Sequence, residues 1–219
     1  MSNPWETWIA PTQQISPLSK FHRVKQIDDV HCGPATIQML LTHLDITVSQ
    51  PDIDNAINAR DFIDERGTRP DELGRAVSIV APQAQLWCKE HTTVEELEAL
   101  VQLYKYPVGV EWQNLFYESI EEEYQDTDGH PEQYDFGHYS IVSHIDVEAD
   151  EVVMVDPYHE FNDEYRYFSL RWFRSRWWDV NPIKDPHTGH IFAKRDEKLS
   201  FIITLKGTPF PKLMGMRPL

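Results

Sequence analysis

Apolar side chains recur at helical spacing directly after the first cysteine of the chain, Cys32. Positions i, i+3, i+4 and i+7 of this stretch are filled by Ile37, Leu40, Leu41 and Leu44. Such spacing places the four side chains on one face of a helix. Other apolar residues widen this face, so the pattern predicts a helix that is buried on most sides.

Three more helices and two strands are predicted before residue 113. The stretches "SQPDIDNAINAR" and "TRPDELGRAVSIV" place Ser49 and Thr68 as capping candidates shortly before an early proline. The stretch "TTVEELEALVQLY" has a capping threonine followed by early glutamates. The alternating run "QAQLWCKE" and the β-branched run "YPVGVEW" predict strands.

Beyond residue 136 the pattern changes to β-branched and aromatic runs. The runs "GHYSIVSHIDV" and "EVVMVDPY" are separated by "EAD", which predicts an antiparallel hairpin. The stretch "YRYFSLRWFRSRWWDV" predicts a short strand and then a helix opened by Ser169, and "KLSFIITL" predicts a last strand. Helices followed mostly by strands indicate an α+β domain with a helical N-terminal lobe and an antiparallel sheet in the C-terminal lobe.

The whole chain, residues 1–219, is expected to form a single domain, and two of its segments stand outside the regular pattern. Residues 1–25 are expected to form an extended lead-in punctuated by prolines. Residues 113–136 are expected to form an insertion, and residues 118–135 contain eight acidic side chains but neither lysine nor arginine. Because long loops in compact domains often serve as lids, one hypothesis is that this segment covers a cleft and selects basic substrates.

Charge and cysteine content narrow the function classes. The net charge is −16, from 36 acidic and 20 basic residues, so the chain repels phosphate backbones and no nucleic-acid partner is expected. No apolar run approaches the roughly 20 residues of a membrane span, and the first residues do not resemble a secretory signal. The two cysteines form no disulfide framework and no metal-binding motif. We therefore expect a cytoplasmic protein without a cofactor, a metal or a membrane partner.

Cys32 is the first candidate for chemistry. A thiol at the start of a helix feels the positive end of the helix dipole and nearby free N–H groups, and both favour the nucleophilic thiolate. Gly33 removes side-chain bulk beside the sulfur and is a candidate for substrate binding, while Pro34 presets the first turn. The alternative is that Cys32 only packs in the core, as cysteines often do. Its position alone leaves both interpretations open.

A base and an orienting carboxylate are predicted at the ends of the hairpin. His138 opens the first strand after Gly137, whose small size leaves room for a substrate, and Asp156 closes the second strand. A carboxylate there fixes the tautomer of an imidazole that serves a nucleophile. A symmetric hairpin would place residue 160 opposite His138, so pairing with Asp156 requires a bulge, a shifted register or a long reach.

Two residues complete the candidate site. Acyl transfer creates an oxyanion, and the side-chain amide of Gln26, six residues before Cys32, is a candidate second donor beside the Cys32 N–H. Trp112, at the end of a strand, is a candidate for the wall of a substrate cleft. The run "DPHTGH", with Asp185, His187 and His190, is weak as a metal site and is more typical of a surface loop.

The order Gln26, Cys32, His138, Asp156 resembles that of papain-like cysteine peptidases. The runs "CGPATIQMLL", "GHYSIVSHID", "VVMVDPY" and "FSLRWFRSRWWDV" resemble the branch that contains bacteriocin-processing, double-glycine peptidases. This resemblance implies a papain-like two-lobed fold in which Cys32 is the nucleophile, His138 the general base and then acid, and Asp156 its orienter. It also implies Gln26 as the oxyanion donor and a peptide or protein as the substrate.

Two other functions use the same residues or the same scaffold. An acyl or γ-glutamyl transferase, resembling phytochelatin synthase or transglutaminase, has a triad in the same order and differs in its acceptor. A non-catalytic papain-like binding module is the third possibility, and the presence of all four candidate residues counts against it. The acceptor site is a pocket rather than a motif, so the sequence leaves hydrolysis and transfer open.

Overall fold

The protein is described by a computed structural model over residues 21–57, 67–113, 137–158, 160–161, 163–185 and 187–219. Within these ranges, seven strands form one antiparallel sheet in the order β5-β4-β3-β2-β8-β1-β9. These strands are β1 (Ala84–Lys89), β2 (Val108–Gln113), β3 (Gly137–Asp146), β4 (Glu151–Val155), β5 (Tyr165–Ser169), β8 (Ser200–Leu205) and β9 (Arg217–Pro218). The fold is α+β, as predicted.

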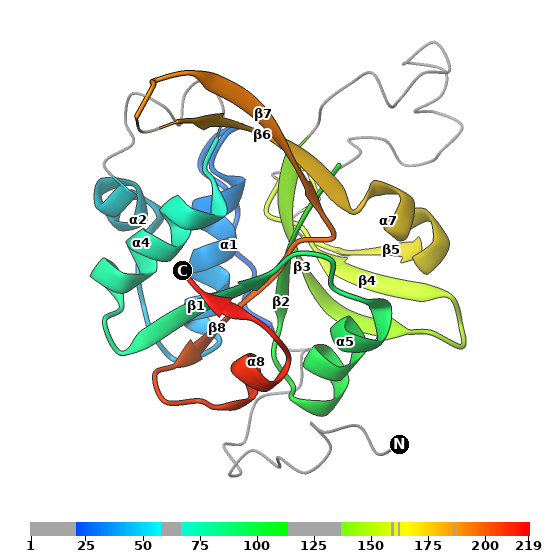
Figure 1. The fold of residues 1–219 in the computed structure, drawn as a ribbon. Coiled ribbons are helices and arrows are strands. Elements are labelled where there is room, and N and C mark those ends of the chain that lie inside the picture. The colour runs from blue at the N-terminus through cyan, green and yellow to red at the C-terminus, as the bar shows by residue number, and fades with distance from the viewer. Residues whose placement is uncertain (1–20, 58–66, 114–136, 159, 162, 186) are drawn as a thin grey trace.

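Helices α1 (Cys32–Thr42), α2 (Gln50–Ile57) and α4 (Pro70–Val80) lie together against one part of the sheet (Figure 1). The predicted apolar face of α1 is buried there, with Ile37 and Leu41 fully inaccessible to solvent. From β1, Leu86 and Cys88 join the same core cluster. The alternation predicted for β1 is therefore confirmed.

A second core lies on the opposite face of the sheet. Since neighbouring residues of a strand point to opposite faces, Trp87 of β1 belongs to this other cluster. This second core is covered by α5 (Val94–Glu98), the π-helical turn η2 (Ala99–Leu103), α7 (Leu170–Arg176) and α8 (Phe210–Leu213). None of the helices in the described residues is long and apolar enough to cross a membrane.

Helix starts follow the predicted caps in three cases and shift in one. At the start of α2, the Ser49 side chain accepts a hydrogen bond from the Asp52 N–H at 3.3 Å. The Thr93 side chain accepts a hydrogen bond from the Glu96 N–H at 3.2 Å, and Ser169 accepts one from Trp172 N–H at 3.1 Å. Helix α4 is capped by Arg69 rather than Thr68, with the Glu72 carboxylate accepting from the Arg69 N–H at 2.9 Å. The side chain at N3, rather than the cap residue, supplies this bond.

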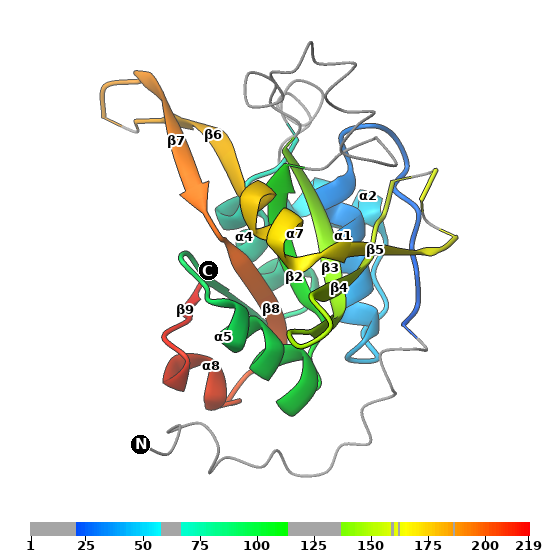
Figure 2. The ribbon, with the colours of Figure 1, turned by 90° about the vertical axis from the view of Figure 1, so that its right-hand side faces the viewer.

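A two-stranded ribbon, β6 (Trp178–Lys184) paired with β7 (Ile191–Glu197), extends away from the large sheet (Figures 1 and 2). The sequence pattern does not predict these strands, because "DPHTGH" is typical of a surface loop and the pairing of the residues on either side is a tertiary property. The base of the ribbon is fastened to β2. Gln113 Nε2 donates to Asp179 Oδ1 at 2.9 Å, and Asn181 Nδ2 donates to Glu111 Oε1 at 3.1 Å.

The acidic insertion falls between two paired strands. Gln113, the last residue of β2, pairs with Gly137, the first residue of β3. The segment between them, 114–136, lies outside the described residues, as does most of the predicted lead-in. Both ends of the insertion are therefore anchored beside His138.

Candidate active site

Cys32 is the first residue of α1, and its side chain is buried to 8% exposure. The helix starts here because Pro34 supplies a preset φ in the first turn, where its missing N–H costs nothing. Gly33 permits close packing: a Cβ at this position would lie 2.1 Å from Thr68 Oγ1. The space on this side of Gly33 is thus filled by Thr68 of the protein itself, and the role of Gly33 in substrate binding stays a prediction.

The β3–β4 hairpin brings His138 and Asp156 together diagonally. Ile141 pairs with Val155, and a register shift after Val142 moves the pairing by one residue. If this register continued beyond Val155, Asp156 would lie opposite Ser140, which is two residues from His138 along β3. Diagonal neighbours on one face are within reach of long side chains. His138 Nε2 accordingly lies 2.8 Å from Asp156 Oδ1.

The other side of the His138 ring interacts with Cys32. Nε2 is engaged by Asp156, which leaves Nδ1 for the hydrogen bond that His138 shares with Cys32. Burial by itself would lower the pKa of His138. The charges of Asp156 and Cys32, and the hydrogen bonds to both, outweigh burial and raise the pKa of His138 to about 10. The carboxylate on one side of the ring and the sulfur on the other therefore favour its protonated form.

Arg166 is the functional neighbour that sequence reasoning missed. Its Nη1 donates to Asp156 Oδ2 at 2.7 Å, and the Tyr158 N–H donates to Asp156 Oδ1 at 2.9 Å. Burial raises the pKa of Asp156, but His138, Arg166 and the Tyr158 N–H lower it to about 2. The guanidinium lies 3.9 Å from the Phe161 ring centroid and 4.9 Å from that of Phe168. Asp156 is thus an ionised carboxylate with a fixed orientation.

Gln26 is tied to the residue that follows Asp156. Its backbone N–H donates to the Pro157 carbonyl at 2.9 Å, and its side chain is 3% exposed. Nε2 donates to the Asp28 carbonyl at 2.5 Å, and Oε1 is buried without a hydrogen-bond partner among the described residues. An amide nitrogen has two N–H groups, so one donor of Gln26 is not used by Asp28.

One predicted substrate contact is corrected by packing. Trp112 has no solvent exposure, donates from Nε1 to Ser140 Oγ at 3.1 Å and packs edge-on against Phe168. It belongs to the second core and cannot form a cleft wall. Gly137 is exposed, and a Cβ there would lie 2.4 Å from the Asp179 carboxylate, while its predicted role beside a substrate stays a prediction. Glycine is needed so that the ribbon can approach the start of β3.

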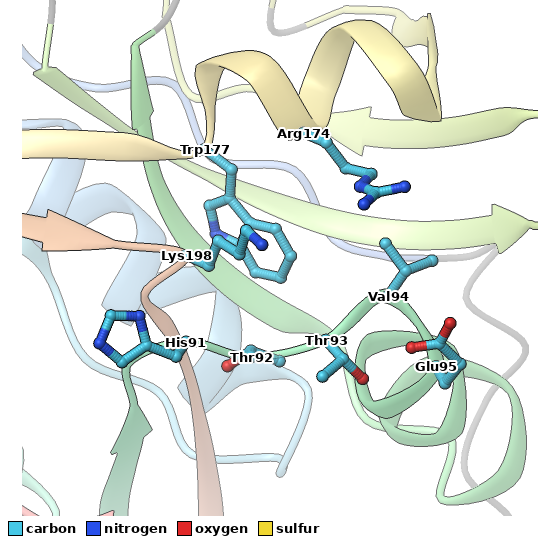
Figure 3. Close-up of a pocket in the computed structure, with 8 residues that line it drawn as sticks. All are labelled: His91, Thr92, Thr93, Val94, Glu95, Arg174, Trp177 and Lys198. Carbon is cyan, nitrogen blue, oxygen red and sulfur yellow. The ribbon is translucent and has the colours of Figure 1, made fainter.

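The remaining candidates lie apart from this cluster. Burial raises the pKa of Cys88 to about 11, which favours the unreactive thiol form. Within the described residues, no group of three or more histidine, cysteine or acidic side chains is arranged to hold a metal ion. A cavity of about 270 Å³ opens between α5, α7 and the β7–β8 turn, with Thr93, Trp177 and Lys198 in its wall (Figure 3). Its lining includes none of the predicted site residues.

Comparison with known proteins identifies the family. The model of the Peptidase_C39 like family matches residues 18–182, which is more than half of the chain. The chain belongs to this family. The match runs from before Gln26 into β6 and so includes all four candidate residues. Membership in the Peptidase_C39 like family supports a function of the cysteine peptidase type.

Solved structures resemble this member of the Peptidase_C39 like family in fold. The peptidase domain of Streptococcus ComA, a bifunctional ABC transporter of a quorum-sensing pathway, matches with a TM-score of 0.53 and 15% identity. The match covers 85% of this chain and 99% of that domain. A double-glycine-motif protease from an AMS/PCAT transporter, in complex with its leader peptide, matches with a TM-score of 0.48, 14% identity and coverage of 85% and 93%. A search of curated proteins gives no significant match.

Proposed function

We propose that the protein is a cysteine peptidase, or a closely related amide hydrolase, that works through a thioester on Cys32. The observation that carries this proposal is the continuous hydrogen-bonded series Cys32–His138–Asp156, in which each member has the partner that its role requires. Family membership and the fold shared with a peptidase domain support the same reaction class. The proposed substrate is a peptide bond.

The first half of the reaction acylates the enzyme. The Cys32 sulfur attacks the carbonyl carbon, and a C–S bond forms while the carbonyl electrons move to oxygen. When the tetrahedral intermediate collapses, the C–N bond breaks and the His138 imidazolium gives its proton to the departing amine. Asp156 holds the ring in position and stabilises its charge, and the acyl group remains on sulfur as a thioester.

The second half returns the enzyme to its starting state. His138, now neutral, accepts a proton from water as the water oxygen attacks the thioester carbon. The C–S bond then breaks, the carboxylic acid product leaves, and the proton on His138 again faces the Cys32 thiolate. Bonds and protons balance with water as the only co-reactant.

Two donors are proposed for the oxyanion that forms in each half. The backbone N–H of Cys32 is in the first turn of α1 and has no carbonyl partner within the helix. The side-chain amide of Gln26 is the second donor. The buried environment of Gln26 strengthens such a bond, because water does not compete for the donor.

Hydrolysis of a fluorogenic peptide library tests this function. Wild-type protein is expected to cleave members of the library, and Cys32→Ala is expected to cleave none while keeping the same circular dichroism spectrum. Cys88→Ala is the matched control, because it removes the other buried thiol, and it should retain activity. Adding an amine or thiol acceptor separates hydrolysis from acyl transfer, since a transferase forms a new adduct in place of the acid.

The acidic insertion is proposed to influence substrate choice. The support is topological: its two ends, Gln113 and Gly137, pair beside His138. Eight acidic side chains in residues 118–135 would favour basic peptides at this position. Deletion of residues 118–134 should reduce the preference for basic over acidic peptides, and an unchanged preference would remove the idea.

We further propose that the chain acts as a single papain-like domain in the cytoplasm. Two features support this: both cores pack on the same sheet, and both cysteines are free thiols. A reducing compartment preserves such thiols. Cell fractionation tests the location, and one cooperative unfolding transition is expected for the single domain.

A further inference from the structure

The loop Lys25–His31 connects the proposed oxyanion donor to the nucleophile. Gln26 lies near its start, and Cys32 follows its end. On one side the loop is held by the bond from the Gln26 N–H to the Pro157 carbonyl. The contacts on the opposite side of the loop therefore also affect the position of the Gln26 amide.

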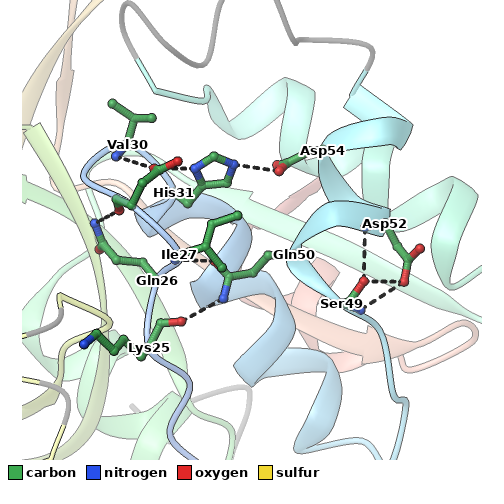
Figure 4. A network of polar contacts seen from close by, with 10 residues as sticks. Lys25, Gln26, Ile27, Val30, His31, Ser49, Gln50, Asp52 and Asp54 are labelled. Carbon is green, nitrogen blue, oxygen red and sulfur yellow. Dashed lines mark hydrogen bonds and ion pairs between the residues drawn. The ribbon is translucent and has the colours of Figure 1, made fainter.

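Helix α2 holds that other side at two points (Figure 4). Gln50 Oε1 accepts from the Ile27 N–H at 3.1 Å, and Gln50 Nε2 donates to the Lys25 carbonyl at 2.8 Å. One turn later on the same face, Asp54 Oδ2 lies 2.6 Å from His31 Nε2. The Gln50 contacts join neutral groups, whereas the contact between Asp54 and His31 joins two ionisable groups.

His31 bridges two carboxylates. Its Nδ1 bonds to Asp28 Oδ1, and its Nε2 bonds to Asp54 Oδ2. A neutral imidazole has one N–H and one lone pair, so it would direct a lone pair at one of these oxygens. Only the imidazolium donates to both. Asp28 also ties this bridge to Gln26, because its carbonyl accepts the Gln26 side-chain bond.

Charge at the bridge follows from its burial and its partners. Within the described part of the chain, the charged groups that bond to the ring are Asp28 from its own loop and Asp54 from α2. Burial lowers the pKa of His31, but both carboxylates outweigh burial and raise it. Burial raises the pKa of Asp54, and this outweighs the effect of His31. The charged form of the bridge, with His31 as the cation, therefore persists above the ordinary pKa of histidine and is lost as the pH rises through the raised pKa of His31.

We propose that His31, bridging Asp28 and Asp54, is a positioning residue that holds the Gln26 amide where the oxyanion forms. This inference rests on the proposed function, in which Gln26 is the oxyanion donor. A raised pKa means that the bridge is fully present below the ordinary pKa of histidine, 6.5, and is lost as the pH rises through the raised value. Steps that need the oxyanion donor then weaken, while the Gln50 contact keeps the loop in place.

Two reactions of the Cys32 thiol distinguish a change in the position of the Gln26 amide from a change in the nucleophilicity of the sulfur. With iodoacetamide, the sulfur displaces iodide: a C–S bond forms, the C–I bond breaks, and no oxyanion appears. With the peptide aldehyde acetyl-Gly-glycinal, the sulfur adds to the carbonyl carbon and the oxygen takes a proton, so the oxygen occupies the oxyanion position. Variants that displace Gln26 should affect the second reaction and spare the first.

The expected results distinguish charge from shape. His31→Gln and Asp54→Asn should weaken the affinity for acetyl-Gly-glycinal by ~10-fold or more at neutral pH, with iodoacetamide alkylation of Cys32 within ~2-fold of wild type. His31→Arg keeps a cation at all pH values and should remove the alkaline loss of aldehyde affinity that wild type shows. Asp52→Asn is the matched control on α2, since among the described residues the Asp52 side chain bonds to Ser49 and not to the bridge, and it should behave as wild type.

Two outcomes overturn the inference, and they differ from failure of the proposed function. If Gln26→Ala weakens aldehyde affinity while His31→Gln and Asp54→Asn leave it unchanged, the bridge does not position the donor. If wild type does not bind the aldehyde, the proposed function fails, and NMR decides the bridge separately. The side-chain amide signals of Gln26, assigned by their loss in Gln26→Ala, should shift as the His31 ring titrates, and unchanged signals refute the coupling.

Discussion

His138 Nε2 and Asp156 Oδ1 lie 2.8 Å apart although the two residues do not face each other across the hairpin. The register shift after Val142 brings Asp156 closer to opposition than a symmetric hairpin would, and the remaining offset is bridged diagonally. Asp156 is fully buried and also bonds to Arg166 and to the Tyr158 N–H. The orientation of the His138 ring therefore depends on a carboxylate that is itself fixed by two more groups.

Replacing Asp156 by asparagine should reduce both activity and stability. Asparagine keeps the shape but removes the charge that orients the imidazolium, so kcat/KM for peptide hydrolysis should fall by at least ~100-fold. Arg166 would also lose its carboxylate partner while buried, which costs on the order of 3–5 kcal/mol of unfolding free energy. Kinetics and urea unfolding of the same variant measure the two effects. Unchanged kcat/KM would contradict the role of Asp156.

The alkylation rate of Cys32 is expected to fall at acidic pH. Replacing Arg166 by methionine should move this fall to higher pH. Burial raises the pKa of Asp156, and removing one of the two cations that oppose burial lets this pKa rise. Asp156 is then protonated at a higher pH, and it loses the negative charge that orients the His138 ring. The measurement is the rate of iodoacetamide alkylation of Cys32 across the acidic range.

The matched control for this variant is Arg195→Met. Arg195 also lies over an aromatic ring, 4.1 Å from the Trp178 centroid, and pairs with Glu197 rather than Asp156. Its replacement should leave the pH profile unchanged, and Arg166→Lys should restore part of the wild-type profile. If the alkylation rate of Arg166→Met falls at the same pH as that of wild type, Arg166 does not lower the pKa of Asp156.

Stability should vary with pH in the manner set by His138 and Asp156. The pKa of His138 is raised to about 10, so its contribution is complete below 6.5 and is lost as the pH rises toward 10. The pKa of Asp156 is lowered to about 2, so its contribution is complete above 3.8 and is lost as the pH falls toward 2. Urea unfolding across this range should show declines at both ends. A His138→Gln variant should lose much of the alkaline decline.

The sequence predicted the elements that carry Cys32, His138 and Asp156, because local rules place helix starts and strand ends. A helix that begins at Cys32 follows from apolar spacing, and strand ends at His138 and Asp156 follow from β-branched runs. Register is a tertiary property, so the sequence allowed a bulge, a shift or a long reach without choosing among them. The structure combines a register shift with a diagonal contact.

Other features depend on packing that local patterns do not carry. Arg166 points inward from β5 while Tyr167 is 62% exposed, which inverts the expected burial of a cation and an aromatic residue. The reason is the buried Asp156, whose charge requires a cation. Trp112 was predicted to face a substrate, but aromatic packing in the second core occupies that space. The ribbon itself was not predicted.

Replacing Gln26 by alanine should separate acylation from nucleophilicity. Loss of one oxyanion donor raises the barrier by about 3–4 kcal/mol, so kcat should fall by roughly 100- to 1000-fold. Iodoacetamide alkylation of Cys32 forms no oxyanion and should proceed near the wild-type rate. Steady-state kinetics and alkylation rates on the same preparation test this. Equal losses in both reactions would mean that Gln26 supports the loop rather than the oxyanion.

The central claim is that Cys32 is an activated nucleophile served by His138. The most direct measurement is the rate of iodoacetamide labelling at Cys32 and Cys88, followed by mass spectrometry at neutral pH in wild type and His138→Ala. We predict that Cys32 reacts at least ~10-fold faster than a free cysteine, that Cys88 remains unlabelled in the folded protein, and that His138→Ala removes the advantage. Labelling of Cys32 no faster than a free thiol, or unchanged by His138→Ala, would contradict the account.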